Sequence, residues 1–592
     1  MRKLKGIIYV AVVAILAAFL GLNTVYAEET TSITTAAELK QAMLSGGAYK
    51  LDADITMASN YSTTAETSLD LNGHTLNAAD KTLVPKAKFT VSDSQGSGKI
   101  TGTAQFKIQV GSSATPGEFM LEGGLLEVPS QYGIQVISGS TFTMNGGKIT
   151  GDNGFLVYNR GTFVMNGGEI ISGATGNVPA VRNNGGASFE MNGGKIIATN
   201  TKGIGINFSF NTTTGEGSTG VINGGEVRAE SNNSAAIVIY KNADLTVNGG
   251  TIVGENGGIV GNGTGPGYNT SSEGTGAKVT VTGGNISSTH GAALYVPQYE
   301  GVTTISGGTI SAEEVAVEIR AGTLNISGGT LIATADSYSF NSNDNGSTTV
   351  GAAVAVAQHV TAQPITVSIC GGVLRGAAPF SAINSEGNTA EDTAKVDINI
   401  QEPCGELRFE STGTQAVAVD DAFTGFIQGG LYTFSVEDYL AEGYGERKNG
   451  EMYEVSKYHT VTIATVENGV VTVSKLRALK GEAITIATEA EDGYELSDLT
   501  AARDASGEVQ IANNSFAMPD GDVVITAVFA STAVAEPEPA PTPAQTGETK
   551  PEALKNDNVE LPNTGDDIIL YVLGFLVSTG GLLAVVPKPR KE

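Results

Sequence analysis

Several residue types are scarce in this sequence of 592 residues, and each shortage excludes a class of fold or site. There is no tryptophan, which disfavours propeller blades that carry a Trp-Asp signature. Two cysteines are too few for a disulfide framework. Charged residues make up only 16% of the chain, and the four histidines lack the spacing of metal ligands. We therefore expect no cofactor and no metal site.

Glycine and acidic residues are abundant instead. The 78 glycines follow no collagen period, which indicates many turns rather than helices. The formal net charge is −28, and loss of the basic N-terminal residues would bring the mature chain to about −31. Such a surface repels nucleic acid and anionic polymers, so we expect no nucleic-acid partner.

The N-terminal 27 residues have the three parts of a secretory signal peptide. A basic start is followed by an apolar run and by Val25-Tyr26-Ala27, with small residues at positions 25 and 27. We place the cleavage between Ala27 and Glu28. An uncleaved membrane anchor is the alternative, and the polar run that follows disfavours it.

The C-terminus combines three signals in a fixed order. A short motif (561–565) precedes an almost wholly apolar stretch (568–586) and a basic tail (587–592). As a helix, the apolar stretch would span about 28 Å, enough for the hydrocarbon core of a bilayer. The basic residues beyond it would stay in the cytoplasm. The motif consists of Leu561, Pro562, Asn563, Thr564 and Gly565.

This C-terminus resembles the cell-wall sorting signal of Gram-positive LPXTG surface proteins. The resemblance implies that the cysteine of a sortase attacks the carbonyl of Thr564. Gly565 would then leave, and an amine of the peptidoglycan precursor would take its place. The mature protein would be secreted and held at the cell surface through Thr564, with membrane contact only before sorting.

A block of the form apolar-x-apolar-polar-Gly-Gly-x-apolar repeats through the middle of the chain. Most of its intervals are 21 to 34 residues, and we interpret the 43-residue interval after Gly329 as two short periods. Apolar residues fill the positions just before the polar residue and two after the glycine pair, which is the period-two alternation of strands with one buried face. The second glycine falls at 124, 147, 168, 194, 225, 250, 284, 308, 329, 372 and 430.

Each unit therefore predicts a strand, a glycine turn, a second strand, a loop and a third strand. Three short strands bury a core only when units stack, which is the pattern of a parallel β-helix over residues 50–435. The chain resembles the right-handed, pectate-lyase-like β-helix of bacterial surface proteins. Residues 28–49 would form an N-terminal cap with a short helix. The corner asparagines Asn145, Asn166, Asn192, Asn223 and Asn248 would stack and hydrogen-bond along the axis.

The sequence pattern changes over residues 457–530, which predict strands of alternating apolar and polar residues separated by Asp-Gly turns. Gly493-Tyr494 and the segment from Met518 to Asp522 resemble the hallmarks of a bacterial repeat module related to the internalin B-repeats. The resemblance implies a small β-grasp-like spacer or contact module. Residues 531–560 are rich in proline and glutamate, which indicates an extended linker through the wall.

We find no catalytic constellation in the sequence. Asp420-Asp421 is an adjacent acidic pair in the late coils, and adjacent strand residues point to opposite faces, so a turn is expected there. Arg320, near Glu318, is expected to form a surface ion pair. The loop 341–346 resembles a calcium loop without its closing glutamate, which favours a solvated loop.

Four further features leave alternatives open. Cys370 and Cys404 could pair across neighbouring coils or remain two inert thiols. Tyr158, Tyr240 and Tyr295 recur in the third strand, where core or edge packing is favoured over a ladder for stacking sugars. Two insertions, 209–219 and 261–276, break the period and are either ligand loops or plain length variation.

Together these features predict a wall-anchored surface protein that is not an enzyme. Its solenoid would act as an adhesin or display protein that binds a host or dietary glycan or a protein. One alternative is a surface polysaccharide lyase or glycoside hydrolase, because β-helices often carry such activities. The other is a purely structural stalk.

Overall fold

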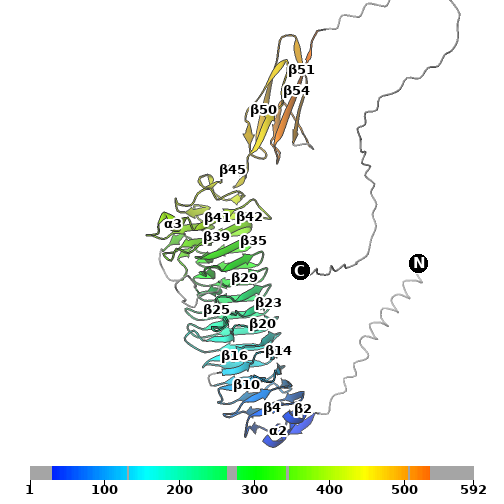
Figure 1. Cartoon of the computed structure of the whole chain (residues 1–592), viewed down its shortest axis with the longest axis vertical. Helices are drawn as coiled ribbons and strands as arrows, with labels where there is room; N and C mark the ends of the chain where they lie inside the picture. The colour runs from blue at the N-terminus through cyan, green and yellow to red at the C-terminus, as the bar shows by residue number, and fades with distance from the viewer. Residues whose placement is uncertain (1–29, 130–131, 263–275, 342–345, 504–506, 534–592) are drawn as a thin grey trace, which may run out of the picture. The chain divides into compact units, whose positions relative to one another are not determined.

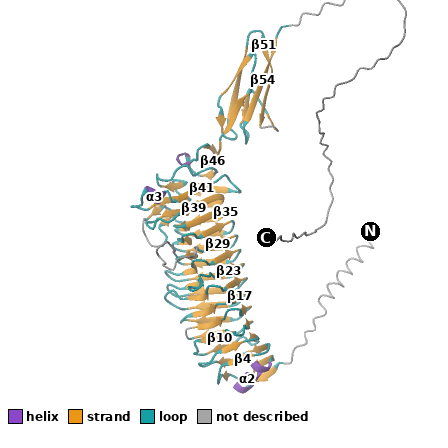
Figure 2. Ribbon diagram, viewed as in Figure 1, coloured by secondary structure: helices purple, strands orange, loops and turns teal. Residues whose placement is uncertain are grey.

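The computed structural model describes residues 30–129, 132–262, 276–341, 346–503 and 507–533. The signal peptide, the linker from residue 534, the sorting motif and the expected transmembrane segment lie outside the described residues. Within the described part, no helix has the length and apolar character that crossing a bilayer requires. The described chain is mostly β-strand, as predicted (Figure 2).

The main body is a solenoid whose coils carry three strands each, and like strands of successive coils pair in parallel (Figure 1). This confirms the parallel β-helix predicted from the repeat. We call the three stacks of strands the first, second and third ladder. The first and second ladders flank the glycine corner, and the third ladder forms a separate 14-stranded sheet.

The first ladder contains β1 (Thr31–Ile33), β2 (Gly47–Leu51), β5 (Thr67–Asp70), β8 (Lys88–Ser92), β11 (Glu118–Leu121), β14 (Thr141–Met144), β17 (Thr162–Met165), β20 (Ser188–Met191), β23 (Thr219–Ile222), β26 (Asp244–Val247), β29 (Lys278–Val281), β32 (Val302–Ile305), β35 (Gly322–Ala333), β39 (Ile365–Gly376) and β41 (Val396–Ile400). The second contains β3 (Ile55–Thr56), β6 (Thr75–Asn77), β9 (Lys99–Thr101), β12 (Leu125–Val128), β15 (Lys148–Gly151), β18 (Glu169–Ser172), β21 (Lys195–Ala198), β24 (Glu226–Ala229), β27 (Thr251–Gly254), β30 (Asn285–Ser288), β33 (Thr309–Ala312), the far halves of β35 and β39, β42 (Leu407–Ser411) and β44 (Gly430–Tyr432). The third contains β4 (Tyr61–Thr63), β7 (Leu83–Pro85), β10 (Phe106–Val110), β13 (Tyr132–Val136), β16 (Phe155–Asn159), β19 (Pro179–Asn183), β22 (Ile204–Phe208), β25 (Ala235–Ile239), β28 (Ile259–Gly261), β31 (Ala292–Val296), β34 (Val315–Ile319), β38 (Ala352–Gln358), β40 (Phe380–Asn384) and β43 (Val417–Val419).

The glycine corner is fixed by backbone conformation and by space. Gly194, the second glycine of its block, has a φ of +83°, which L-residues with a side chain rarely adopt. A Cβ built there would also lie 2.7 Å from the terminal methyl of Met165, which packs beneath the corner from the preceding coil. The inward column Met144, Met165 and Met191 pairs in register on adjacent coils and is fully buried. The predicted strand register is therefore confirmed.

The corner asparagines form the predicted hydrogen-bonded ladder. Asn166 Nδ2 donates to Asn145 Oδ1 at 2.8 Å, and Asn192 Nδ2 donates to Asn166 Oδ1 at 2.9 Å. The chain continues through Asn223 and Asn248, each at 2.9 Å. Because every link joins two coils, the ladder adds a bond along the axis at each step.

Both ends of the solenoid are covered. The helix α2 (Ala36–Ser45) begins with a capping box in which Glu38 N donates to Thr35 Oγ1, and its residues Leu39 and Met43 are buried in the core. At the other end, β45 (Tyr444–Asn449) and β46 (Met452–Lys457) form a hairpin that pairs antiparallel with β44. This hairpin covers the outer edge of β44, and the sequence pattern did not predict it.

The interpretation of the 43-residue interval as two periods is wrong. β35 pairs directly with β39, and β34 with β38, so residues 334–351 are an insertion within a single coil. The insertion contains a short hairpin, β36 (Ser339–Phe340) and β37 (Thr349–Val350). Two short helices, α3 (Ala390–Thr393) and η1 (Glu437–Tyr439), lie in later loops.

Residues 459–531 form a module with its own hydrophobic core, which includes Val461, Ile484, Phe516 and Ile525. Its strands lie in two sheets, ordered β49-β47-β54-β51-β52 and β48-β50-β53. The strands are β47 (His459–Ile463), β48 (Gly469–Val473), β49 (Arg477–Ala478), β50 (Ala483–Ala490), β51 (Tyr494–Arg503), β52 (Gly507–Val509), β53 (Ser515–Ala517) and β54 (Val523–Ser531).

Candidate functional site: a groove on the third ladder

The outer face of the third ladder carries a short shelf of aromatic rings. Phe106, Tyr132 and Phe155 start three successive strands and pair in register. Their ring centroids are 5.0 Å and 5.3 Å apart, and the ring of Tyr158 lies 5.7 Å from that of Phe155. All four side chains are half-buried, so one side of the shelf remains accessible. Such a surface offers flat apolar contact area beside polar groups.

Arg182 extends this shelf by one coil. It pairs in register with Tyr158, and its guanidinium carbon lies 5.2 Å from the ring centroid of Phe155 and 6.0 Å from that of Tyr158. These distances are typical of cation–π contacts. The Nε of Arg182 is buried and has no hydrogen-bond partner in the described chain. Arg182 is thus held by rings and not by a carboxylate.

A groove of about 740 Å³ opens next to Arg182. Its lining combines aromatic rings, amides, hydroxyls and two arginines, Arg160 and Arg182, but no aspartate or glutamate. Its principal residues are Phe155, Tyr158, Arg160, Asn177, Arg182, Asn184, Asn207, Phe210, Thr213 and Tyr240. A second hollow of about 550 Å³ shares Phe155 with the groove and has Asp152 in its lining.

The insertion 209–219 forms one wall of the groove. Phe210 forms an antiparallel bridge with Gly217, and Ser218 N donates to Ser209 O at 2.9 Å, which closes the insertion into a compact loop. Lys241 Nζ lies 4.8 Å from the Phe210 ring centroid, and Asn242 Nδ2 donates to Gly215 O at 2.6 Å. The insertion therefore lines a groove, and its role as a ligand loop remains a prediction. Most of the other insertion, from residue 263 to 275, lies outside the described residues.

Of the three recurring tyrosines, Tyr158 and Tyr295 lie on third-ladder strands and Tyr240 directly follows β25; all three are half-buried. Tyr158 and Tyr240 line the groove, and Tyr295 lies several coils away. They therefore do not form one continuous row. The aromatic shelf that does form depends on Phe106, Tyr132 and Phe155, which sequence reasoning missed because no repeated motif marks them.

Arg320 forms a buried ion pair, so the expectation of a surface pair is wrong. Its Nε lies 3.0 Å from Glu318 Oε1, with side-chain exposures of only 7% and 0%. The insertion 334–351 folds over the pair, and Thr348 N and Thr349 N donate to Glu318 Oε2 at 2.9 Å and 3.2 Å. Burial raises the pKa of Glu318, whereas Arg320 and the Thr348 donors act to lower it. This site is closed by the chain itself.

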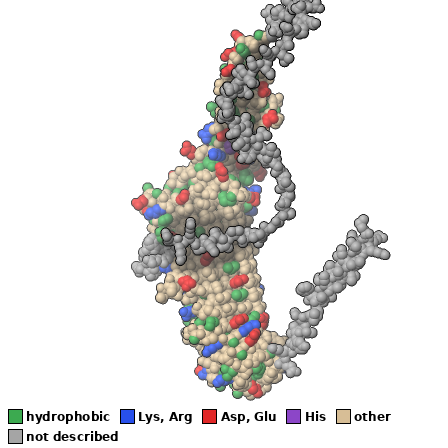
Figure 3. All heavy atoms as spheres, turned by 45° about the vertical axis from the view of Figure 1, so that its right-hand side comes forward, with side chains coloured by type: hydrophobic (Ala, Val, Ile, Leu, Met, Phe, Trp, Pro, Cys, Tyr) green, Lys and Arg blue, Asp and Glu red, His purple; other side chains and the backbone are tan. Residues whose placement is uncertain are grey.

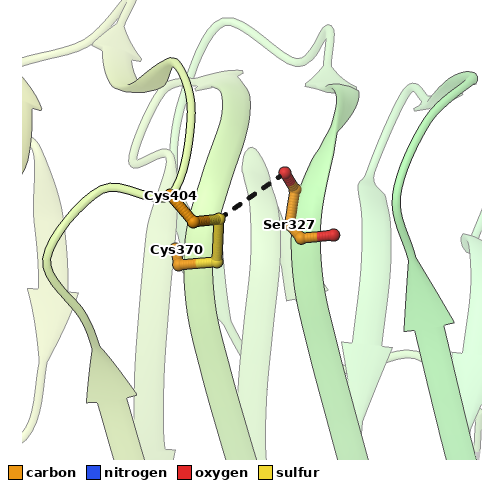
Figure 4. Close-up of a disulfide and its surroundings, with 3 residues drawn as sticks. All are labelled: Ser327, Cys370 and Cys404. Carbon is orange, nitrogen blue, oxygen red and sulfur yellow. Dashed lines mark hydrogen bonds between the residues drawn. A yellow bond between two sulfur atoms is a disulfide. The ribbon is translucent and has the colours of Figure 1, made fainter. Parts of the chain in front are cut away.

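Cys370 and Cys404 form a disulfide with Cα atoms 5.2 Å apart (Figure 4). Cys370 stands directly before Gly371-Gly372, so it holds the place that asparagine has in earlier coils. Cys404 N donates to Cys370 O at 2.8 Å, and Cys404 Sγ lies 3.9 Å from Ser327 O. Of the two open alternatives, the structure thus favours pairing. The disulfide continues the corner column where the asparagine ladder has ended.

The remaining candidates do not assemble into a site. His290 pairs with Glu255 at 2.9 Å and His459 with Asp520 at 3.3 Å, and the described residues contain no group of three metal-ligating side chains. Asp420 Oδ2 accepts a hydrogen bond from Asn384 N at 2.7 Å at the edge of a turn. Residues 342–345 of the suspected calcium loop lie outside the described residues.

The cleavage and anchoring residues Ala27, Glu28 and Leu561 to Gly565 also lie outside the described residues, so they remain predictions. A family model described as divergent InlB B-repeat domain matches residues 459–533. This match agrees with the resemblance that the sequence indicated for the C-terminal module. No curated protein and no solved structure matches the chain. The chain thus combines a repeat β-helix with a segment similar to InlB-type B-repeats.

Proposed function

We propose that this protein is an adhesin displayed on a Gram-positive cell wall. The observation that carries the proposal is the groove on the third ladder, which combines aromatic rings, amides and unpaired arginines on a rigid solenoid. Insertions on solenoids concentrate where ligands bind, and one insertion walls this groove. The B-repeat-like module between solenoid and linker is compatible with surface display.

Covalent attachment through Thr564 rests on the sorting signal in the sequence. Mass spectrometry of protein released by muramidase should detect peptidoglycan fragments on a chain that ends at Thr564. A Thr564→Ala variant should be lost from the wall fraction, whereas Thr546→Ala in the linker should leave anchoring unchanged. Chains that end at Glu592 in the wall fraction would contradict the sorting proposal.

Binding without turnover separates an adhesin from the two alternatives. Hydrolases require paired carboxylates near the scissile bond, and the groove lining has none. We therefore expect the purified protein to bind members of a panel of pectins, glycosaminoglycans and mucin glycans saturably. Their chain lengths should remain unchanged after long incubation. Shortened polymers would show that the protein is a polysaccharide-degrading enzyme. If it binds neither this panel nor host proteins, the structural stalk is the remaining alternative.

A further inference from the structure

Two arginines of the groove lack carboxylate partners in a strongly acidic protein. The sequence has 62 acidic and 34 basic residues, yet within the described chain neither Arg160 nor Arg182 makes a side-chain hydrogen bond or an ion pair. Other arginines do pair, for example Arg228 with Glu226 and Arg408 with Glu410. On the solenoid face shown in Figure 3, basic and acidic side chains are scattered among uncharged ones. Within the described chain Arg375, Arg477 and Arg503 also make no ion pair, so what distinguishes Arg160 and Arg182 is that both line one groove without a carboxylate.

A second site in the same protein, around Arg320, contains an arginine near a tyrosine ring together with a carboxylate. Tyr158 and Tyr295 stand in the same outward column of the third ladder, which we call the outer column. In the coil after Tyr295, Glu318 occupies this column, and the guanidinium carbon of Arg320 lies 5.5 Å from the Tyr295 ring centroid. The outer column runs through Gln109, Gln135, Tyr158, Arg182, Asn207, Val238, Val260, Tyr295, Glu318, Ala355, Ser381 and Ala418.

Arg160 and Arg320 are also equivalent, since each lies two residues after the outer-column position of its coil. Both sites thus combine an arginine, an outer-column aromatic ring and neighbouring polar groups. They differ in one component, because Glu318 provides a carboxylate in one site and the groove contains none. The group that the groove lacks is a carboxylate, and a ligand can supply it.

We infer that the groove binds an oligosaccharide that carries a carboxylate, and this inference rests on the proposed function. The carboxylate lies against Arg182 and Arg160, where charge-assisted and bidentate hydrogen bonds are available. A sugar ring packs on the accessible side of Phe155 and Tyr158. Asn207 is only 7% exposed, lines the groove, and its amide has no hydrogen bond in the described chain, so it pairs with a sugar hydroxyl.

A saccharide fits this surface better than a peptide strand. The strands β16, β19 and β22 are already paired on both sides, so the groove has no free edge for an added strand. The uncharged part of the lining consists largely of amides, hydroxyls and aromatic rings, which match the hydroxyls and apolar faces of sugars.

The net charge of −28 restricts the number of carboxylates on the ligand. A long polyanion extends beyond the two arginines and meets the acidic surface, which repels it. A single carboxylate among neutral sugars stays within the groove, since charges beyond about 8 Å are screened at physiological salt. We therefore expect one acidic sugar on an otherwise neutral glycan.

The test uses the full-length protein and 3′-sialyllactose, with its methyl ester and lactose as neutral counterparts, in isothermal titration. We expect saturable binding of 3′-sialyllactose, and binding of the ester and lactose that is weaker by about tenfold to a hundredfold. A disaccharide of glucuronic acid and N-acetylglucosamine and a glutamate-containing tripeptide extend the panel. Equal affinity for acid and ester, or binding of the tripeptide alone, would overturn the inference.

Two variants connect the binding to the groove. Arg182→Gln removes the charge and the guanidinium but keeps a polar amide, so the affinity for 3′-sialyllactose should fall to that for lactose. Arg228→Gln, on the second ladder, is the matched control and should bind as the unaltered protein does. Unchanged melting curves for both variants exclude loss of fold as the cause. Undiminished binding by Arg182→Gln contradicts the assignment.

The inference and the proposed function can fail separately. If no carboxylated sugar binds but solenoid-dependent adhesion of whole cells persists, the ligand class is wrong and the adhesin proposal stands. If 3′-sialyllactose binds through Arg182 but the protein is absent from the wall fraction, the ligand class stands and surface anchoring is wrong.

Discussion

Two sites along the outer column, one around Arg182 and one around Arg320, contain similar side chains, but the first is open to solvent and the second is closed. Both place an arginine near a tyrosine ring. At Arg320 the insertion 334–351 covers the site and Glu318 neutralises the charge, whereas at Arg182 the insertion 209–219 stands beside the site and leaves it open. The two sites thus differ in the path of the insertion and in one outer-column residue, and we expect only the open site to bind a ligand.

The energetics of the two sites differ accordingly. A buried ion pair gains little net free energy, but breaking it leaves an uncompensated charge in a dry site. An arginine packed on rings at an accessible surface retains partial solvation and is held by contacts that are individually weak. Substitutions at the closed site should therefore change stability, and those at the open site should change binding.

The largest effect is expected from a substitution that breaks the strand register on which both sites depend. Met165→Asp puts a carboxyl into a fully buried column, at a cost on the order of 5 kcal/mol from the several-unit pKa rise of a buried acid. Limited proteolysis should then cut first near residues 140–195, because coils contact only their neighbours. The module 459–531, which has its own core, should stay resistant.

Thr143→Asp is the matched control for Met165→Asp. Thr143 lies on the outer side of the first ladder in register with Val164 and, one coil further, with Glu190, so this column already accepts a carboxylate. A change within about 0.5 kcal/mol is expected, as for most surface substitutions. If Thr143→Asp is as damaging as Met165→Asp, the assignment of inward and outward faces is wrong, and the outer column with it.

Removal of the internal carboxylate should come next. Glu318→Gln keeps the shape of the side chain but leaves Arg320 charged and buried, which should cost about 3–5 kcal/mol. Hydrogen exchange of amides in β34 and β38 should report the loss locally. The double variant Glu318→Gln/Arg320→Gln should recover part of it, because no unpaired charge remains.

Glu169→Gln is the control for the buried pair. It breaks the exposed pair of Glu169 with Lys148, at 3.3 Å, and should cost less than about 1 kcal/mol. Similar exchange rates for Glu318→Gln and Glu169→Gln would mean that the Arg320 site is not sealed, and the contrast between closed and open sites would disappear.

The Cys370–Cys404 disulfide lies in the coils that follow the closed Arg320 site. Cys370 and Cys404 are 34 residues apart, so the loop-closure estimate predicts a loss of about 3–4 kcal/mol on reduction. Hydrogen exchange should rise in β39, β41 and β42, whereas the amides of Thr348 and Thr349, which Glu318 holds, should remain protected. Loss of protection at Thr348 on reduction would show that the disulfide, and not the ion pair, keeps the insertion in place.

The solenoid could be predicted from the sequence because its determinants repeat. Each glycine pair, apolar column and corner asparagine appears at the same place in many coils, so an error at one coil does not change the fold. The asparagine ladder follows from the same regularity. The position of Cys404 could not be predicted in the same way, because its coil turns at residues 401–406 without a glycine pair. Only its contact with Cys370 places it in the corner column.

The groove could not be predicted because nothing in it repeats. Phe155 and Arg182 lie on two successive coils and Phe210 lies in an insertion, and they meet only because strands 24 to 25 residues apart pair in parallel. The burial of Glu318 depends on an insertion whose path no period describes. Contacts that rest on single residues and irregular loops require the three-dimensional structure.

The smallest change in stability and the sharpest test of the contrast come from converting the open site into a closed one. Asn207 follows Arg182 in the outer column, so Asn207→Glu gives the guanidinium an internal carboxylate. Asn207 is only 7% exposed, so the new pair is nearly buried; because desolvation offsets the attraction in such a pair, stability should change little. Binding of 3′-sialyllactose should nevertheless fall to the level of lactose, because the new carboxylate occupies Arg182 and repels that of the ligand.

Val238→Glu is the matched control for Asn207→Glu. Position 238 lies one coil further along the column and about 10 Å from Arg182, which is beyond the screening length, so this variant should bind 3′-sialyllactose as the unaltered protein does. If Asn207→Glu binds the acidic sugar as before, Arg182 does not receive the carboxylate, and the resemblance between the two sites carries no functional meaning.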